Sequence, residues 1–290
     1  MTSRAIVSIG TNSTRVLAIE VDDPAPKILL QRSTGTRIGE GLRESGRLSE
    51  DAMRRTLEAI EDHLTAVRQF HPDLKAIATS ALRRADNAGE FSESIRAIIG
   101  RPLEIISGEE EARCSYEGAI SGLPAERSHG VLDVGGGSSE YATRDAHVSL
   151  EIGAVRLTER FPSLREIASV DEVVRARAEV QTALRPLRAL ARVDRLVMVG
   201  GSATTSRAVV ATRRMTDPYE ALTRAEIGSV IDRLASLPLE HRKALPGAVA
   251  QRADILLAGA LILDEACGLT GHTEALVSTN DLLLGYLLRH

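Results

Sequence analysis

A strand that runs into a glycine turn occurs twice in this chain, and this repeat constrains the fold more than any other feature. Residues 4–9 (RAIVSI) lead into Gly10, and residues 130–134 (GVLDV) lead into Gly135, 125 positions later. The match extends from the strand through the turn into a following strand, which indicates duplication of one structural unit. A chance similarity between two glycine turns is the alternative.

The element order around the first copy is typical of a mixed sheet with helices packed against it. Ser49 is expected to cap a long helix whose apolar residues recur at helical spacing. Strands are expected over residues 4–9, 15–21, 27–33, 75–79 and 103–106, helices over 88–99 and 108–121, and a turn at 22–24.

The second copy continues in the same manner. Strands are expected over residues 130–134, 138–143, 147–152, 195–199 and 275–278, and helices over 155–160, 171–191, 223–236, 252–267 and 281–288, with one more from Ser202. A length of 290 residues is about twice the usual domain size. We therefore predict an α/β protein with two domains, residues 1–123 and 124–290.

Charge and composition exclude several classes of protein. The chain has 36 basic and 40 acidic side chains, a net charge of −4, which argues against binding nucleic acid by bulk charge. Three Phe, four Tyr and no Trp are too few for a base-stacking platform. The sequence shows no signal peptide and no apolar run of 18 residues, so we expect a cytoplasmic protein without a membrane partner. Two cysteines without a CxxC pair argue against a zinc site.

Both glycine turns carry hydroxyl side chains, a composition that favours phosphate binding. Glycine lets backbone N–H groups approach an anion closely, and successive N–H groups form a nest for phosphate oxygens. An ordinary hairpin turn is the alternative for each turn alone. The candidate phosphate ligands are Thr11, Asn12 and Ser13 in the first turn, and Gly135, Gly136, Gly137 and Ser138 in the second.

Two carboxylates flank the second turn and are candidate ligands for Mg²⁺. Asp133 stands at the end of an apolar strand, where a carboxylate is costly without a partner, and Glu140 follows the turn. Mg²⁺ takes oxygen ligands and leaves positions for water and substrate phosphate. The alternative is that Asp133 only caps the turn and that Glu140 is solvated.

Three further stretches have residues suited to phosphate chemistry. Arg83 follows an expected strand, where a guanidinium can clamp a phosphate, although a surface ion pair is the simpler interpretation. Residues 109–111 are three consecutive glutamates that open a helix, and acids stabilise any helix N-terminus. Composition cannot select one of them as a base. Gly200 and Gly201 repeat the arrangement of strand, glycine and helix.

Taken together, these stretches resemble the exopolyphosphatase/guanosine pentaphosphate phosphohydrolase (Ppx/GppA) family, in order along nearly the whole chain. The matching segments are 9–15 (IGTNSTR), 79–83 (TSALR), 106–113 (ISGEEEAR), 133–140 (DVGGGSSE), 149–157 (SLEIGAVRL) and 200–204 (GGSAT). Sugar kinases and chaperone ATPases share the glycine turns, whereas residues 106–113 and 133–140 are much more selective. The resemblance implies the family's short form, with two actin-like (ribonuclease H-like) domains and an active cleft between them.

The resemblance also implies roles for individual residues. Glu111, the second Glu of the family's Glu-Glu-Ala-Arg motif, would be the general base that activates water, and Arg83 would bind phosphate. Asp133 and Glu140 would hold Mg²⁺ or position water, and the turn from Gly135 would bind phosphate through its backbone. The family usually has Asp where this chain has Ser8, and the internal repeat aligns Ser8 with Asp133. One carboxylate is therefore missing from the expected site.

We expect a Mg²⁺-dependent exopolyphosphatase that releases terminal phosphate from inorganic polyphosphate by direct attack of water. Removal of the 5'-phosphate of pppGpp is a close variant. A phosphate- or nucleotide-binding regulator that lost turnover is an alternative from another class, and Ser8 is the feature that supports it. A kinase of the same superfamily fits the Glu111 motif less well. A homodimer is compatible with the sequence.

Overall fold

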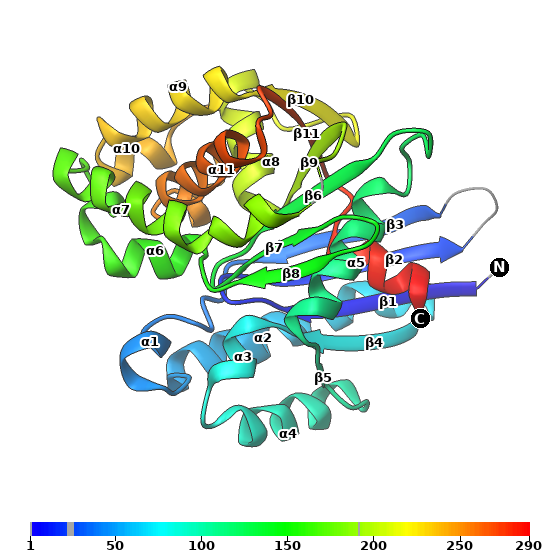
Figure 1. Ribbon diagram of the computed structural model, residues 1–290. Coiled ribbons are helices and arrows are strands. Elements are labelled where there is room, and N and C mark those ends of the chain that lie inside the picture. Colours follow the sequence, from blue (N-terminus) through cyan, green and yellow to red (C-terminus); the bar gives the residue numbers. More distant parts are fainter. Residues whose placement is uncertain (1, 22–25, 191) are drawn as a thin grey trace. The chain divides into compact units, whose positions relative to one another are not determined.

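The computed structural model describes residues 2–21, 26–190 and 192–290, which divide into two compact units (Figure 1). Unit 1 contains the chain up to Glu111 together with Tyr286–His290, and unit 2 is Ala112–Gly285. Helices α5 (Gly108–Ile120) and α12 (Leu282–Arg289) therefore contribute residues to both units. The units defined by contacts differ from the linear division at residues 123 and 124, which stays a prediction for the domains.

Unit 1 is built on a five-stranded mixed sheet of order β3-β2-β1-β4-β5. Strand β1 pairs antiparallel with β2 and parallel with β4. The strands are β1 (Thr2–Ile9), β2 (Thr14–Val21), β3 (Lys27–Thr34), β4 (Asp73–Ala78) and β5 (Glu104–Ile105). The helices are α1 (Leu42–Ser45), α2 (Glu50–Val67), α3 (Ser80–Arg84) and α4 (Ala88–Ile99), with the 3-10 turn η1 (Arg68–Phe70).

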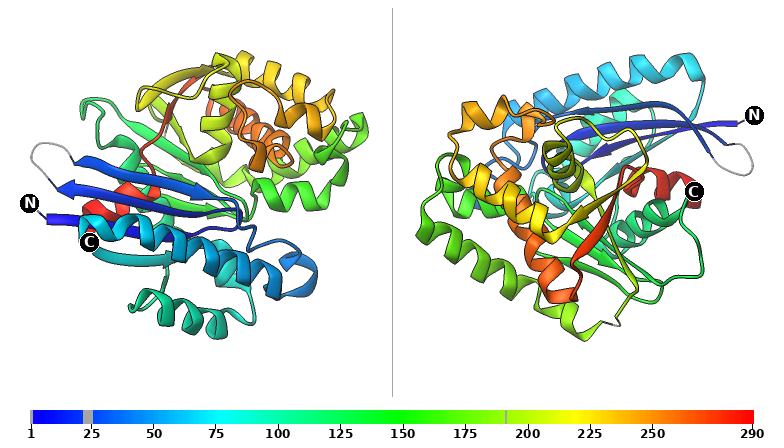
Figure 2. Two further views of the ribbon diagram at one scale, coloured as in Figure 1. Left: turned by 180° about the vertical axis from the view of Figure 1, so that it is seen from behind. Right: turned by 90° about the horizontal axis from the view of Figure 1, so that it is seen from above.

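Helix α2 covers one face of this sheet (Figure 2, left). The Ser49 side chain accepts a hydrogen bond from the Ala52 N–H, so it caps α2 as the sequence predicted. The apolar side of the helix packs against alternate residues of β1 and β2, among them Val7, Ile9 and Val16. This alternation turns the remaining side chains of β1 and β2 to the other face of the sheet.

Unit 2 is built on a six-stranded sheet of order β10-β11-β9-β6-β7-β8. Its strands are β6 (His129–Val134), β7 (Ser139–Ala142), β8 (His147–Leu150), β9 (Arg195–Val199), β10 (Tyr219–Thr223) and β11 (Glu274–Ser278). Its helices are α6 (Ala154–Arg160), α7 (Val170–Ala183), α8 (Gly200–Ala211), α9 (Arg224–Ala235), α10 (Leu239–Lys243) and α11 (Leu256–Thr270), with the 3-10 turns η2 (Pro162–Arg165), η3 (Arg185–Ala189) and η4 (Ala250–Arg252).

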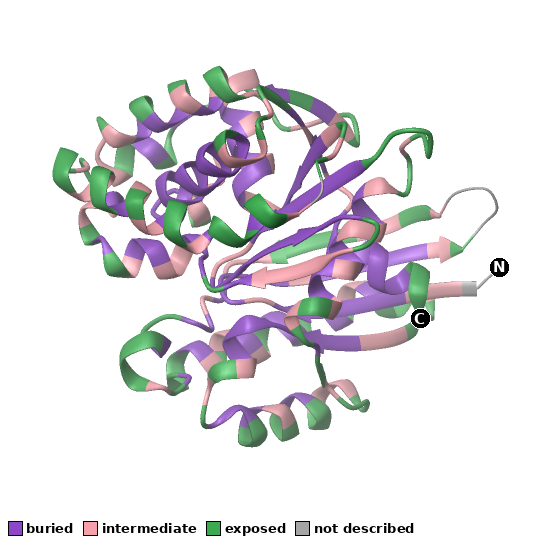
Figure 3. Cartoon of the chain, in the orientation of Figure 1, coloured by how far each residue is buried: buried purple, intermediate pink, exposed green. Residues whose placement is uncertain are grey.

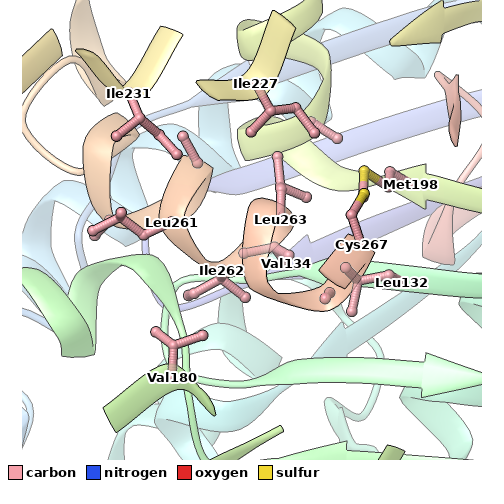
Figure 4. Close-up of a cluster of buried hydrophobic side chains, with 14 of the residues drawn as sticks. Leu132, Val134, Val180, Met198, Ile227, Ile231, Leu261, Ile262, Leu263 and Cys267 are labelled. Atoms are coloured by element: carbon pink, nitrogen blue, oxygen red, sulfur yellow. The ribbon is translucent and has the colours of Figure 1, made fainter. Parts of the chain in front are cut away.

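Helix α11 forms the centre of the unit 2 core. It is buried from Leu256 to Cys267, which Figure 3 shows as a continuous purple stretch. Its apolar side chains pack against β6, β9, α7 and α9 (Figure 4). Cys114 and Cys267 are both buried, and neither forms a disulfide bond. Within the described residues, no helix is long and apolar enough to cross a membrane.

The internal repeat predicted from the sequence is visible in the topology. The order β3-β2-β1-β4-β5 in unit 1 corresponds to β8-β7-β6-β9-β11 in unit 2, with the same strand directions at every step. The two glycine turns also close in the same way. The Gly10 N–H donates to the Ser13 carbonyl at 3.0 Å, and the Gly135 N–H donates to the Ser138 carbonyl at 3.1 Å.

Most expected elements agree with the structure to within a few residues, and the larger differences have local causes. The expected helix 171–191 ends at Ala183, because Pro186 has no N–H to continue it and η3 follows. The expected helix 252–267 begins at Leu256, after η4. Strand β10 was not predicted, since its buried Glu220 obscures the apolar alternation. The expected turn at residues 22–24 lies outside the described residues.

Candidate active site

The first glycine turn is buried and is held by backbone hydrogen bonds. The side chains of Thr11, Asn12 and Ser13 are all buried. The Thr11 carbonyl accepts from the Gly39 N–H at 3.0 Å, and the Asn12 carbonyl accepts from the Arg37 N–H at 2.9 Å. Both carbonyls are hydrogen-bonded to the loop at residues 37–39. Their partial negative charges therefore do not repel an anion bound at the turn.

Asn12 makes an incomplete set of hydrogen bonds within the described residues. Its Nδ2 donates to Ser13 Oγ at 3.1 Å, whereas its buried Oδ1 has no hydrogen-bond partner there. A buried polar atom without a partner is costly, and it points to a ligand or a water molecule at that position. An amide oxygen accepts hydrogen bonds and an ionised phosphate oxygen has no proton to donate, so this atom calls for a donor such as water. The assignment of Thr11, Asn12 and Ser13 as phosphate ligands stays a prediction.

Glu111 and Arg83 lie together in unit 1. Arg83, on α3, donates from Nη1 to Glu111 Oε2 at 2.8 Å and to the Ile106 carbonyl at 2.9 Å. The Glu111 side chain is 9% exposed and the Arg83 side chain is 21% exposed. Arg83 and Glu111 therefore form a partly buried ion pair in unit 1.

The three consecutive glutamates that the sequence could not separate have different surroundings. Glu109 is exposed. Glu110 is half-buried, and its Oε1 lies 3.4 Å from Nε of Arg289, a residue of α12. Glu111 is buried and contacts Arg83. Ser107 caps the helix by accepting from the Glu110 N–H at 3.1 Å. Helical geometry therefore points the three acids in three directions, and Glu111 is the one in a buried polar site.

The second glycine turn is built in unit 2 by the start of α6. The Ala154 N–H donates to the Gly135 carbonyl at 2.9 Å, and the Val155 N–H donates to the Gly136 carbonyl at 2.9 Å. These bonds turn both carbonyls toward α6. Ser138, which closes the turn, is buried. The predicted phosphate ligands Gly135, Gly136, Gly137 and Ser138 thus belong to one turn, in which the carbonyls of Gly135 and Gly136 are engaged by α6.

Asp133 and Glu140 lie directly opposite each other on the antiparallel strands β6 and β7. Their side chains therefore project from the same face of the sheet, with Cβ atoms about 5 Å apart. Both are buried, at 8% and 1% exposure. Ser115 Oγ, on α5, donates to Asp133 Oδ2, and Ser149 Oγ donates to Glu140 Oε1, each at 2.8 Å. The alternative of a solvated Glu140 is wrong.

These two carboxylates fit a magnesium ion that shares its coordination with substrate. Mg²⁺ is commonly held by one or two carboxylates with phosphate oxygens and water. In the described part of the chain, no group of three or more His, Cys, Asp or Glu side chains is arranged to hold a metal by protein ligands alone. Asp133 and Glu140 thus fit as a two-carboxylate set that substrate phosphate completes.

Sequence reasoning missed Arg252, which reaches the third glycine turn. Gly200 has φ of +84°, and a Cβ there would lie 2.6 Å from Asp133 Oδ1. At Gly201, a Cβ would overlap the guanidinium of Arg252. The turn thus lies between a carboxylate and a guanidinium at the start of α8. No sequence signal marks Arg252, because it lies at the end of η4, about 50 positions after the turn that it reaches.

Known proteins are similar to this chain in sequence over most of its length. The model of the Ppx/GppA phosphatase family matches residues 17–271. Exopolyphosphatase 2 of Mycobacterium tuberculosis is 31% identical, over 99% of this chain and 98% of that protein. The bifunctional 3-dehydroquinate synthase/phosphatase of Fusobacterium nucleatum is 28% identical, over 98% of this chain and 46% of that protein.

Solved structures of similar proteins have the same fold. The Ppx/GppA family member of Aquifex aeolicus has a TM-score of 0.82 and 31% identity, over 99% of this chain and 97% of that one. An exopolyphosphatase of Cytophaga hutchinsonii has a TM-score of 0.90 at 22% identity, over 99% and 97% of the two chains, and this likeness supports the fold.

The fold and the paired acidic and glycine-rich segments define a hydrolase that acts on phosphoanhydride bonds, built from two actin-like α/β domains. The chain belongs to the Ppx/GppA phosphatase family.

Proposed function

We propose that this protein is an exopolyphosphatase that releases terminal phosphate from inorganic polyphosphate and requires Mg²⁺. The observation that carries the proposal is the buried pair Asp133 and Glu140 beside a glycine turn, in a family of phosphoanhydride hydrolases. Identity of 31% to a protein named exopolyphosphatase 2, over nearly the full length of both chains, supports polyphosphate as the substrate.

Glu111 is assigned as the general base. It takes a proton from water while the water oxygen bonds to the terminal phosphorus, and the bond from that phosphorus to the bridging oxygen breaks. The bridging oxygen leaves on the shortened chain, and orthophosphate is the other product. Arg83, in contact with Glu111, holds the base in place and donates to a phosphate oxygen.

The remaining candidate residues bind the substrate. Two turns bind the phosphates by donating hydrogen bonds from N–H and hydroxyl groups to phosphate oxygens. They are the turn of Thr11, Asn12 and Ser13 and the turn of Gly135, Gly136, Gly137 and Ser138. Asp133 and Glu140 hold Mg²⁺. When bound, Mg²⁺ offsets the negative charge of the phosphate oxygens.

Two alternatives use the same residues. Hydrolysis of pppGpp breaks the same kind of bond but also needs a pocket for the base and ribose. A regulator that binds polyphosphate or nucleotide without turnover is favoured by one observation, the serine at position 8 in place of the family's aspartate.

The test is phosphate release from long-chain polyphosphate, pppGpp and ATP, each with Mg²⁺ and with EDTA. We expect the highest kcat/KM for polyphosphate and loss of release in EDTA. Faster release from pppGpp would assign the nucleotide as substrate. Tight binding of polyphosphate without release from any compound would establish the regulator.

A further inference from the structure

Unit 2 contains a pocket that none of the candidate active-site residues lines. Its volume is about 400 Å³, within the range of pockets that bind small molecules. Strand β7, the turn η3 and the C-terminal end of α11 meet there, so segments distant in sequence build it. The lining residues on which the inference rests are Tyr141, Leu187, Arg188, Arg192, Leu269 and His272, all of unit 2.

The pocket and the predicted magnesium ligands belong to opposite faces of the unit 2 sheet. Tyr141 on β7 lies opposite Leu132 on β6, and both belong to the core around α11. Asp133, the next residue of β6, therefore projects from the other face. The Tyr141 hydroxyl lies against Gly130, near the start of β6, whereas the glycine turn begins at Gly135. Five residues of strand span about 16 Å, so a ligand in this pocket is separate from one at the turn.

The hydroxyl of Tyr141 is a buried polar group that the described residues leave without a partner. The residue is 2% exposed, and its Oη forms no hydrogen bond to any described residue. A Cβ at position 130 would lie 2.3 Å from this Oη, so glycine there makes room for the hydroxyl. Burial raises the pKa of Tyr141 above its ordinary value, and the hydroxyl keeps its proton at neutral pH. Because buried hydroxyls are normally hydrogen-bonded, this one points to a bound molecule that supplies an acceptor.

The lining of the pocket is positively charged and partly apolar. Arg188 of η3 and Arg192 both line it, and none of the described residues around it is acidic. Neither guanidinium forms an ion pair or a hydrogen bond with another described residue. Leu187 and Leu269 add apolar surface. A guanidinium donates paired hydrogen bonds to an acidic group, so the lining suits an anion with an apolar body.

The other polar groups of the pocket limit the charge of that anion. His272 Nε2 donates to the Val193 carbonyl at 3.2 Å, and its Nδ1 lies 3.0 Å from Thr270 Oγ1, so the protein itself occupies both ring nitrogens. Residues 268–271 at the end of α11 also line the pocket. The C-terminal end of a helix carries partial negative charge, which disfavours a doubly charged group there. A singly charged acidic group fits better.

We propose that this pocket binds a small organic anion, an apolar body that carries one singly charged acidic group. The acidic group pairs with Arg188 and Arg192, and the apolar body packs against Leu187 and Leu269. Tyr141 donates a hydrogen bond to an oxygen of the ligand. The site is independent of the proposed function, because none of its residues takes part in that reaction.

The dye anilinonaphthalene sulfonate tests the site, because it carries one sulfonate on an apolar body and its fluorescence rises on binding. Titration of the full chain should show one saturable site. Arg188→Gln and Tyr141→Phe should each raise Kd by about 3- to 10-fold, the range for loss of one hydrogen bond. Arg185→Gln, in the same turn η3, and Tyr116→Phe, on α5, are the matched controls. Neither residue lines the pocket, so both controls should keep the wild-type Kd.

A second dye separates recognition of charge from apolar contact. Anilinonaphthalene without the sulfonate should bind the wild type about tenfold more weakly, and Arg188→Gln should leave its Kd unchanged. Since such dyes also bind partly unfolded proteins, thermal unfolding of each dye-free variant establishes that it is folded. Tripolyphosphate should not displace the sulfonate dye, because the pocket is separate from the phosphate-binding turns.

Several results would overturn the proposal. They are the absence of saturable binding, equal Kd values for the two dyes, and a wild-type Kd in a folded Arg188→Gln or Tyr141→Phe protein. Displacement by tripolyphosphate would place the dye at the candidate active site instead. Dye binding that depends on Arg188 and Tyr141 in a protein that releases no phosphate from polyphosphate would keep this site and refute only the exopolyphosphatase.

Discussion

At the scale of single residues, burial separates side chains that the sequence leaves equivalent. Glu109, Glu110 and Glu111 are chemically identical neighbours, yet only Glu111 is buried, and it contacts Arg83. The sequence predicted that a helix begins here, because three consecutive acids are a local signal for a helix N-terminus. Composition could not choose among the three acids, since their burial depends on α3 and on the C-terminal segment, and only the resemblance to the family named Glu111 as the base.

Replacing the proposed base should remove most of the turnover. Glu111→Gln should lower kcat by about 10²- to 10⁴-fold, the usual contribution of general base catalysis, with little change in tripolyphosphate binding. Glu109→Gln is the matched control from the same helical turn and should keep kcat near the wild-type value. Steady-state kinetics on polyphosphate measure both, and equal kcat in the two variants would reduce Glu111 to a structural acid.

Arg83 should be sensitive to loss of its planar fork. Arg83→Lys keeps the charge but cannot reproduce the paired contacts to Glu111 and to the Ile106 carbonyl. We expect the inhibition constant of inorganic phosphate to rise by about tenfold, with an unchanged fold by circular dichroism. Arg84→Lys, at the exposed neighbouring position, should leave the constant unchanged. Identical kinetics for Arg83→Lys and wild type would exclude a role in phosphate binding.

At the scale of elements, local patterns predicted the strands and turns. Side-chain contacts between segments distant in sequence were not predicted. The glycine turns and the Ser49 cap are fixed by neighbours in sequence, so both were predicted. Arg252 and Arg242 act through contacts with segments distant in sequence. Arg242 lies on α10 and Arg252 on η4, and no short sequence pattern encodes how these two elements pack against distant segments.

Arg242 should be a large contributor to the stability of unit 2. This fully buried residue of α10 donates to the carbonyls of Leu237 at 2.9 Å, Leu164 at 2.6 Å and Glu166. Burial lowers its pKa to about 10, so it stays charged at neutral pH. Arg242→Met leaves these acceptors without their donor and should reduce the free energy of unfolding by about 3 kcal/mol.

Chemical denaturation measures this loss. The exposed Arg185 provides the control, and Arg185→Met should change the free energy of unfolding by less than about 0.5 kcal/mol. If Arg242→Met changed the free energy of unfolding by as little, the carbonyls that Arg242 bonds would have other hydrogen-bond donors in the variant.

At the scale of the whole molecule, two buried histidines link stability to pH. Burial lowers the pKa of His63, on α2, and of His129, on β6, below the ordinary value of 6.5. His63 Nε2 donates to the Thr14 carbonyl at 3.2 Å, next to the first glycine turn. No sequence motif surrounds either histidine, so their burial could not be predicted.

Stability should fall as pH decreases below about 6.5. In this range the unfolded chain binds protons at these histidines while the folded protein does not, so protonation favours unfolding. Urea unfolding between about pH 5 and 7 should show this slope, and His63→Gln should reduce it. His241→Gln, on the exposed surface of α10, should leave the slope unchanged. A slope unaffected by His63→Gln would show that His63 titrates normally in the folded protein.

The most direct test of the central claim is oxygen labelling during hydrolysis. Polyphosphate of defined length is incubated with the protein and Mg²⁺ in H₂¹⁸O, and the products are analysed by mass spectrometry. Direct attack of water on the terminal phosphorus predicts one ¹⁸O atom in each released orthophosphate and none in the shortened chain. Label in the shortened chain, internal cleavage products or absence of released phosphate would contradict the account.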